Sequence, residues 1–368
     1  MRKLLVIGLI ILIAGLMALI AGCGSGVSST AVPSSPPEVR PGPAVKLAFT
    51  TQPVGVIAGS AFDTQPVVAV EDAEGNIVTS YRGLVVLTIT ADTGASEARL
   101  FGGTMAGLVN GMVEFRELSI DKARTGYTLT ATSGTLVPAT SIPLTILPGA
   151  PVKLALTMQP SGGVAGSPLT TQPEVTVQDI YGNMVTSHEG SVTLSATITY
   201  ESESFGAVTS GTTTVPVVNG VARFTDISFD KAIPGYKLSA ISDSLKSATS
   251  TFFTVSPAAP AKLEFTVQTE GAKAGTPFET QPKVAVEDIY GNVVTSSRAS
   301  ISLSITPDSG TAEAILSGTT ILVAEGGMGG LAVFTGLSID QAGSAYILTA
   351  TSSGLKSATS QAFDVSAP

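Results

Sequence analysis

Three aspartates in nearly identical surroundings are the first residues of this sequence that could support chemistry. Asp72, Asp179 and Asp288 lie in the segments AVEDAEGNIVTS (69–80), TVQDIYGNMVTS (176–187) and AVEDIYGNVVTS (285–296). Calcium prefers clustered carboxylate and amide oxygens, so these aspartates are one candidate for a calcium site. Their spacing differs from the D-x-[DN]-x-[DN]-G calcium loop. We therefore expect turns at these positions, and our main prediction contains no metal and no other cofactor.

The same segments have the composition of a tight turn between two strands. Asp closes such turns through its side chain, and Gly supplies the left-handed backbone conformation that they require. The residues to which we assign this structural role are the Gly-Asn pairs Gly75 and Asn76, Gly182 and Asn183, and Gly291 and Asn292.

Two tyrosines at the tips of these turns are candidate ligand contacts. Tyr181 and Tyr290 follow the turn aspartates by two residues, where the first copy has Glu74. Exposed aromatic rings can stack on sugars, which would make the second and third copies carbohydrate-binding. The alternative is that each ring packs across a neighbouring loop or an interdomain joint. Because Trp is absent and aromatic residues make up only 5% of the chain, the sequence favours packing.

Catalysis is not expected from this chain. The only histidine, His188, occupies a position filled by Tyr81 and Ser297 in the other copies. The sequence contains no G-x-S-x-G elbow, no phosphate-binding loop and no H-E-x-x-H motif. The acidic residues recur on repeated turns instead of converging as a pair, so glycosidase chemistry has no natural place. We predict a non-enzymatic protein.

The overall composition favours β-sheet and argues against nucleic-acid binding. Only 13% of the 368 residues are charged, and the formal net charge is −9. An acidic chain without a basic stripe repels the phosphate backbone, which dominates affinity for nucleic acids. The abundance of Val, Thr, Ser and Gly is typical of half-buried strands.

From Ala44 onward the sequence is a threefold repeat. Lys46, Lys153 and Lys262 open the copies, which recur at intervals of about 107 to 110 residues. This period matches a whole immunoglobulin-type sandwich. Within each copy, apolar residues alternate with polar or variable ones, the signature of antiparallel strands. We predict three β-sandwich repeats, which we name repeat 1 (44–148), repeat 2 (149–257) and repeat 3 (258–368), joined by short Pro-containing segments into a semi-rigid rod.

A tyrosine near the end of each copy points to a particular sandwich family. Tyr127, Tyr236 and Tyr346 each follow an Asp-containing loop and open a Y-x-L-x-A strand. This pattern resembles the tyrosine corner of immunoglobulin-like domains. Together with V-x-D-x-x-G-N-x-V, it resembles the bacterial immunoglobulin-like repeats of surface proteins, including the invasin and intimin group. The resemblance implies an all-β fold of tandem immunoglobulin-like antiparallel sandwiches, used in that group as stalks, spacers or adhesive tips.

The N-terminus has the pattern of an export signal. Arg2 and Lys3 precede an apolar run that ends at Leu19-Ile20-Ala21-Gly22-Cys23. The last five residues resemble the lipobox of bacterial lipoproteins, which implies a signal peptide over 1–22 and lipidation of Cys23. An uncleaved membrane anchor is the alternative, because the apolar run approaches bilayer-spanning length. Residues 23–43, rich in Ser, Gly and Pro, form a predicted disordered tether.

These features predict an extracytoplasmic, lipid-anchored protein, placed at the cell surface. Its partners would be the membrane, through lipid at Cys23, and a glycan or surface-protein ligand. We expect the repeats to act as a stalk or adhesion module. The alternatives are a carbohydrate-binding surface protein that uses Tyr181 and Tyr290, or a purely structural envelope component.

Overall fold

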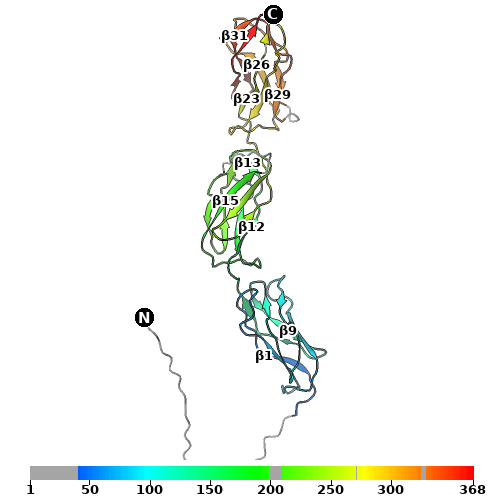
Figure 1. The fold of residues 1–368 in the computed structure, drawn as a ribbon. Helices are drawn as coiled ribbons and strands as arrows, with labels where there is room; N and C mark the ends of the chain where they lie inside the picture. The colour runs from blue at the N-terminus through cyan, green and yellow to red at the C-terminus, as the bar shows by residue number, and fades with distance from the viewer. Residues whose placement is uncertain (1–39, 199–208, 271, 325–328) are drawn as a thin grey trace, which may run out of the picture.

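The computed structural model of the chain describes residues 40–198, 209–270, 272–324 and 329–368. These residues fold into strands and loops, and Figure 1 shows three β-sandwiches that follow one another end to end as a rod. Across these ranges there is no helix long and apolar enough to cross a membrane. The predicted signal peptide, Cys23 and most of the predicted tether lie outside the described residues.

Repeat 1 is built from two main sheets and two short strand pairs. One sheet has the order β1-β2-β6 and the other the order β10-β9-β3-β5, while β11 pairs with β8 and β4 with β7. The strands are β1 (Lys46–Thr51), β2 (Val67–Glu71), β3 (Leu84–Ile89), β4 (Leu100–Phe101), β5 (Met105–Gly107), β6 (Met112–Glu114), β7 (Ser119–Ile120), β8 (Arg124–Tyr127), β9 (Leu129–Thr132), β10 (Ala139–Thr140) and β11 (Leu144–Ile146).

Repeat 2 has the same arrangement, with sheets β12-β14-β18 and β17-β15-β20-β21. Its strands are β12 (Lys153–Met158), β13 (Gly163–Val164), β14 (Glu174–Gln178), β15 (Ser191–Ile198), β16 (Thr209–Ser210), β17 (Thr214–Pro216), β18 (Val221–Arg223), β19 (Ser228–Phe229), β20 (Tyr236–Ile241), β21 (Ala248–Thr249) and β22 (Val255–Ser256).

Repeat 3 again has this arrangement, with sheets β23-β25-β29 and β28-β26-β32-β33. Its strands are β23 (Lys262–Val267), β24 (Ala272–Lys273), β25 (Lys283–Glu287), β26 (Ser300–Ile305), β27 (Leu316–Ser317), β28 (Ile321–Val323), β29 (Leu331–Val333), β30 (Ser338–Ile339), β31 (Gly343–Tyr346), β32 (Leu348–Thr351), β33 (Ala358–Thr359) and β34 (Phe363–Ser366).

Each repeat encloses its own hydrophobic core between the two sheets. The three core clusters draw their buried residues from Leu47 to Ile146, from Leu154 to Val255 and from Leu263 to Val365. The strand pattern places Val68 and Val70 inward, and both are fully buried. Ala69, on the opposite face, is also fully buried. The alternation expected of an antiparallel strand therefore does not give an exposed residue here, because β2 is the central strand of its sheet and Ala69 is paired with Ala48 of β1 on one side and with Met112 of β6 on the other.

The sandwiches are mainly antiparallel, and in the described residues each repeat pairs in parallel at two places. One is a bridge from the opening lysine, which joins Lys46 to Val137, Lys153 to Lys246 and Lys262 to Lys356. The other lies further along each repeat. In repeat 2, β13 pairs in parallel with β22, and in repeat 3 β24 pairs in parallel with β34. Repeat 1 has the corresponding parallel bridge between Ile57 and Leu147. The N-terminal part of each repeat therefore leaves the first sheet and pairs with the last strand of the same repeat. This pairing places the Ala-Gly segment that follows it at the end of the sandwich where the next repeat begins.

Candidate functional site: the joint between repeats

The D-x-x-G-N segment of each repeat forms a turn around a buried aspartate. In repeat 2, Oδ1 of Asp179 accepts hydrogen bonds from the backbone N–H groups of Tyr181 and Asn183, both at 2.9 Å. Gly182 has a φ of 83°, the left-handed conformation expected for it. Asp179 is 1% exposed, yet its carboxylate is well supplied with donors. The side chain therefore shapes the turn from inside, because a buried carboxylate needs such partners.

The second oxygen of the same aspartate holds the segment that enters the repeat. Oδ2 of Asp179 accepts the N–H of Gly149 at 2.9 Å, and Oδ2 of Asp288 accepts the N–H of Ala258 at 2.8 Å. In repeat 1, Gly42 donates to Asp72 in the same way at 2.9 Å. Gly42 lies within the predicted tether, so ordered contacts with the turn begin before residue 44. Each aspartate fixes both the turn and the connecting segment.

The asparagine of the turn contacts the preceding repeat. In the first joint, Nδ2 of Asn183 donates to the carbonyl of Asp121 at 2.8 Å, and Oδ1 accepts the N–H of Ala123 at 2.9 Å. Nδ2 also donates to Asp179 at 2.8 Å. The amide side chain thus pairs with two backbone groups at once, as another strand would. Since all its polar atoms are satisfied, this residue is buried without penalty.

The second joint repeats this geometry almost unchanged. Asn292 donates to the carbonyl of Asp230 at 2.7 Å and accepts the N–H of Ala232 at 2.9 Å. Its Nδ2 also donates to Asp288 at 2.8 Å. Asn183 and Asn292 are 7% and 8% exposed. The two joints are therefore formed by the same set of asparagine hydrogen bonds.

A lysine and the turn-tip tyrosine complete each joint. Nζ of Lys122 donates to the carbonyl of Tyr181 at 2.8 Å, and Nζ of Lys231 donates to the carbonyl of Tyr290 at 2.9 Å. The Tyr181 ring lies against Gly59, where a β-carbon would come within 2.1 Å of the ring. The Tyr290 ring covers Gly166 in the same manner. These tyrosines pack across the joints, although 40% and 39% of their surfaces remain exposed.

The tyrosine corner connects the joint to the core of the preceding repeat. The hydroxyl of Tyr127 donates to the carbonyl of Lys122 at 2.8 Å, and that of Tyr236 donates to the carbonyl of Lys231 at 2.9 Å. Burial, together with the nearby charge of Asp230, raises the pKa of Tyr236 to about 12. The phenol therefore remains a donor at ordinary pH. The loop that contacts the next repeat is therefore hydrogen-bonded to a fully buried tyrosine, Tyr127 in repeat 1 and Tyr236 in repeat 2.

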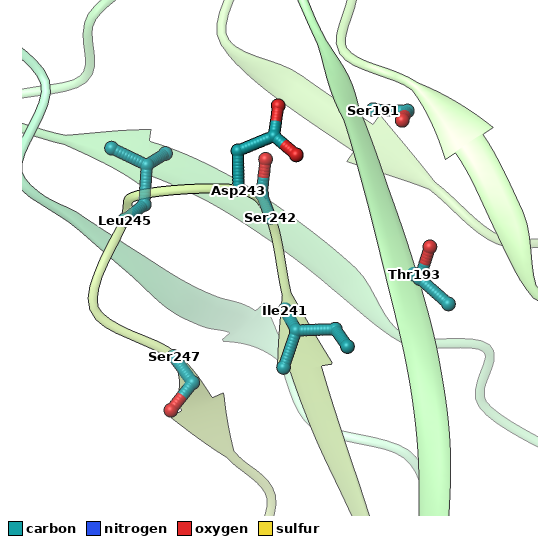
Figure 2. Close-up of a pocket in the computed structure, with 7 residues that line it drawn as sticks. All are labelled: Ser191, Thr193, Ile241, Ser242, Asp243, Leu245 and Ser247. Carbon is teal, nitrogen blue, oxygen red and sulfur yellow. The ribbon is translucent and has the colours of Figure 1, made fainter.

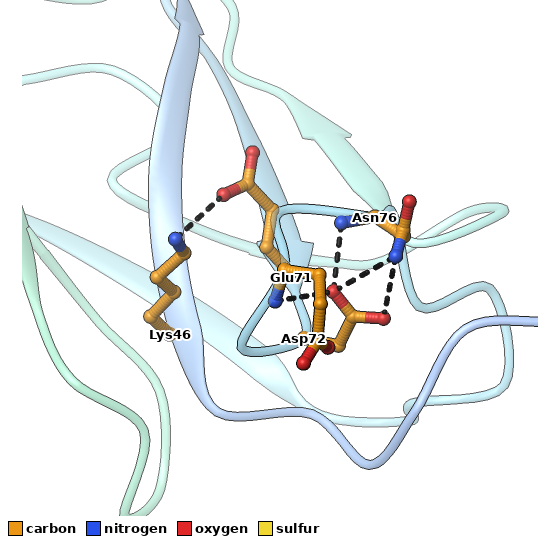
Figure 3. Close-up of polar contacts among 5 residues, drawn as sticks. Lys46, Glu71, Asp72 and Asn76 are labelled. Atoms are coloured by element: carbon orange, nitrogen blue, oxygen red, sulfur yellow. Dashed lines mark hydrogen bonds and ion pairs between the residues drawn. The ribbon is translucent and has the colours of Figure 1, made fainter.

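Repeat 1 carries the same turn with no repeat before it in the described chain. Figure 3 shows that Asn76 turns its amide toward Asp72, with Nδ2 to Oδ2 at 3.0 Å, and that Lys46 faces Glu71. Asn76 is half-buried, in contrast to its buried counterparts. Glu74 stands where the other repeats have Tyr181 and Tyr290. The turn of repeat 1 therefore lacks the ring that packs on the preceding repeat in the two joints.

The hydrogen bonds of the turn also set the acidity of its carboxyl groups. The side chain of Asn76, assisted by backbone N–H groups, lowers the pKa of Asp72 to about 2. Burial acts to raise the pKa of Asp288, but hydrogen bonds from the side chain and backbone of Asn292 and from other N–H groups leave that pKa below its ordinary value. Both carboxyls are therefore ionised acceptors at neutral pH.

The calcium hypothesis receives little support from this geometry. The oxygens of Asp72, Asp179 and Asp288 point at N–H donors, which occupy the lone pairs that a cation would require. In the described part of the chain, no three His, Cys, Asp or Glu side chains are grouped so that they could hold a metal ion. The turn hydrogen bonds account for the aspartates without a ligand.

Surface depressions lie both at the first joint and away from it. One of about 660 Å³ is lined by residues 96–99 together with Asp121 and Lys122 of the joint. Figure 2 shows one in repeat 2, of about 400 Å³, where Thr193, Asp243 and Ser247 lie around its rim. Asp243 is exposed. The depression contains no buried charge and no paired carboxylates, so it has no chemical feature of an active site.

Sequence reasoning located the turns but missed the residues that receive them. Lys122, Lys231, Gly59 and Gly166 received no role from the sequence. A signal for them is present, because D-K-A and A-G-S recur in repeats 1 and 2 at matching positions. The signal is hard to interpret, since nothing local shows that these segments meet a turn some 60 residues further along the chain. Cys23 lies outside the described residues.

The known proteins to which the chain is similar are solved structures of low sequence identity. No protein-family model matches it, and no curated protein matches it. Among solved structures it is similar to FdeC, an Escherichia coli adhesin, at 15% identity over 90% of this chain and 100% of that chain, with a TM-score of 0.33. It is also similar to invasin, a bacterial integrin-binding protein, at 12% identity over 86% of this chain and 60% of that chain, with a TM-score of 0.31.

A third similar structure comes from an animal protein. The fibronectin-type domains FN1–FN3 of chicken CNTN1 align at 12% identity over 88% of this chain and 98% of that chain, with a TM-score of 0.31. The fold assignment itself rests on the sheets, cores and tyrosine corners described above. The chain is a tandem array of immunoglobulin-like β-sandwiches.

Proposed function

We propose that this protein is a non-enzymatic surface stalk or adhesion module, whose docked repeats hold its far end away from the membrane. The observation that carries the proposal is that both joints use the same set of hydrogen bonds and the same ring-on-glycine contact. Freely jointed repeats would need only a linker. Repeated, specific contacts between neighbours are what a rod requires.

The energetics support a joint that stays closed for most of the time. Each hydrogen bond contributes on the order of 1 kcal/mol. Because neighbouring repeats are linked by a few residues, docking is intramolecular, and the effective concentration is in the millimolar range. A contact that would be weak between separate molecules therefore suffices within one chain. The Pro-containing linkers reduce the freedom that docking must overcome.

The rod can be tested by small-angle X-ray scattering on residues 40–368. Replacing both joint asparagines, as Asn183→Ala with Asn292→Ala, should shorten the average end-to-end extension and broaden the distribution of shapes. Asn76→Ala is the matched control, because that turn has no preceding repeat. If the double variant scatters like the parent chain, the joints do not hold the rod straight.

The membrane end of the proposal rests on Cys23. Two acyl chains at this residue would anchor the protein, since each buried CH₂ contributes about 0.8 kcal/mol. Expression in a bacterium fed a labelled fatty acid should label the parent chain, and Cys23→Ser should release an unlabelled protein from the membrane fraction. Retention of the variant in membranes would favour the uncleaved anchor.

Carbohydrate binding remains a second candidate because of one observation. Although they pack on glycine, Tyr181 and Tyr290 keep 40% and 39% of their surface exposed. A glycan array probed with residues 40–368 tests this use of the rings. Saturable binding that is lost in Tyr181→Ala with Tyr290→Ala, but kept in Asn183→Ala with Asn292→Ala, would identify the rings as a sugar platform instead of a joint element.

A further inference from the structure

Repeat 3 has the same receiving surface as repeats 1 and 2, and in the described chain nothing covers it. We name the surface formed by Gly275, Asp340, Gln341 and Ala342 the open socket. These residues correspond in sequence to Gly59 and Asp121–Ala123 in repeat 1. A β-carbon at Gly275 would meet nothing within 4 Å, whereas at Gly59 and Gly166 it would meet a tyrosine ring.

The polar groups of the open socket are oriented as in the occupied joints. Gly275 has a φ of 71°, close to the 74° of Gly59. The hydroxyl of Tyr346 donates to the carbonyl of Gln341 at 3.0 Å, which is the tyrosine corner again. The side chain of Asp340 accepts the N–H of Ile315 at 2.7 Å. The loop is therefore held in its receiving conformation before any partner arrives.

Within the described residues, no hydrogen bond reaches the two groups that would pair with an asparagine. The N–H of Ala342 and the carbonyl of Asp340 have no protein partner there, while their counterparts at Ala123 and Asp121 bind Asn183. Ala342 is exposed, whereas Ala123 and Ala232 are half-buried. The donor and acceptor are free and already arranged for a side-chain amide.

We propose that the open socket is a binding site for the Asp-x-Tyr-Gly-Asn turn of another immunoglobulin-like repeat. The two occupied joints define the ligand. An asparagine amide pairs with the Ala342 N–H and the Asp340 carbonyl, and an aromatic ring covers Gly275. The side-chain amide of Gln341 replaces the lysine as donor to the carbonyl at the tip of the turn.

The free turn of repeat 1 on a second copy of the chain fits this site poorly. It has Glu74 where the ring is needed, and a carboxylate gains little by covering a glycine. Gln341 carries no charge that could attract Glu74, although lysine occupies this position in both closed joints. The socket therefore selects a Tyr-bearing turn over the chain's own Glu-bearing turn.

The test adds a fourth repeat to the chain. In the tandem protein, residues 40–366 are followed by a second copy of 257–368, which keeps the spacing of the natural joints because Pro257 and Ala367 occupy equivalent positions. Residues 40–368 contain no cysteine. Spin labels on Ser304→Cys in both copies of repeat 3 therefore report the new joint alone, through the distribution of distances measured by pulsed electron paramagnetic resonance.

If the open socket is a binding site, the distribution across the new joint should be as narrow as that across the natural joint, measured with Ser195→Cys and Ser304→Cys in the parent chain. Asn292→Ala in the added copy alone should make the distance distribution across the new joint broad. In a matched tandem protein, residues 40–366 are followed by 41–148, so that the added turn carries Glu74. Spin labels on Ser304→Cys and on Thr88→Cys of the added repeat should give a broad distribution of distances across this joint.

Three results would overturn the proposal. A broad distribution at the new joint beside a narrow one at the natural joint would show that the socket does not bind. An equally narrow distribution with residues 41–148 would make a second copy of this chain a suitable partner and remove the selection for tyrosine. Broad distributions at both joints would remove the proposed rod and this site together, so failure of the stalk is distinguishable from failure of the socket alone.

Discussion

At the scale of single residues, Gly59 and Gly275 form a matched pair that separates backbone strain from joint packing. Both have left-handed φ values, 74° and 71°, so alanine at either position costs roughly 1 to 2 kcal/mol of strain. Only at Gly59 would the new β-carbon strike a ring. We predict that Gly59→Ala displaces Tyr181 and raises its reactivity toward a tyrosine-nitrating reagent.

Peptide mapping by mass spectrometry measures this nitration site by site. Gly275→Ala should lose a similar amount of stability and leave the nitration of Tyr181 and Tyr290 unchanged. Equal nitration of Tyr181 in the two variants would mean that the ring does not rest on Gly59 in solution.

The low pKa of Asp72 predicts a specific dependence of stability on pH. Its folded pKa is about 2, below the unfolded value near 3.9. Its charge therefore stabilises the fold fully above about pH 4, and this contribution is lost as the pH falls through 2. In denaturant unfolding, the parent chain should be more stable than Asp72→Asn at pH 6, and the difference should shrink toward pH 2. A stability difference between the two proteins that stays constant from pH 6 to pH 2 would contradict the lowered pKa of Asp72.

At the scale of elements, the tyrosine corner has two separable roles. Tyr127→Phe removes the hydrogen bond to the carbonyl of Lys122 and should destabilise repeat 1 by about 1 kcal/mol. Because that loop also binds Asn183, the variant should loosen the first joint. Hydrogen exchange at the Ala123 amide should then become faster, as followed by mass spectrometry of the peptide that contains it.

The matched variant is Tyr346→Phe, in the corner whose loop has no partner in the described chain. It should lower the stability of repeat 3 by a similar amount and leave exchange at Ala123 unchanged. Unchanged exchange at Ala123 in Tyr127→Phe would show that the corner does not support the joint.

The strands were predictable because their signal is local. Alternation identifies the buried positions of β2 and β9, and the three internal copies show which positions tolerate change. Val68, Leu129 and Ala131 are buried as the pattern requires. The burial of Ala69 was missed because it depends on the strands that flank β2, which no short segment reveals.

The joint was only partly predictable for the same physical reason. Asp179 and Gly182 shape a turn through contacts within a few residues, so their types and spacing reveal the role. Asn183 and Lys122 act on partners about 60 residues away. Asparagine and lysine are also common in solvent-exposed turns and loops, so the residue types alone do not reveal a contact with another repeat. For Tyr181, the sequence favoured packing across a neighbouring loop or an interdomain joint over sugar binding, but it did not identify Gly59 as the contact.

At the scale of the whole molecule, the two joints share no residue and are separated by the body of repeat 2, as Figure 1 shows. Changes at distant sites without shared partners are usually additive. We therefore predict that Asn183→Ala broadens the distance distribution between spin labels on Thr88→Cys and Ser195→Cys, across the first joint. The distribution between Ser195→Cys and Ser304→Cys, across the second joint, should stay as it is in the parent chain.

The reciprocal variant, Asn292→Ala, should reverse this pattern, and the double variant should show both changes at their single-variant sizes. The physical reason is that each asparagine bonds only to its own turn and to the corner loop of the repeat before it. If Asn183→Ala also broadened the second joint, the repeats would be coupled through the body of repeat 2. The rod would then bend as one cooperative unit instead of at independent joints.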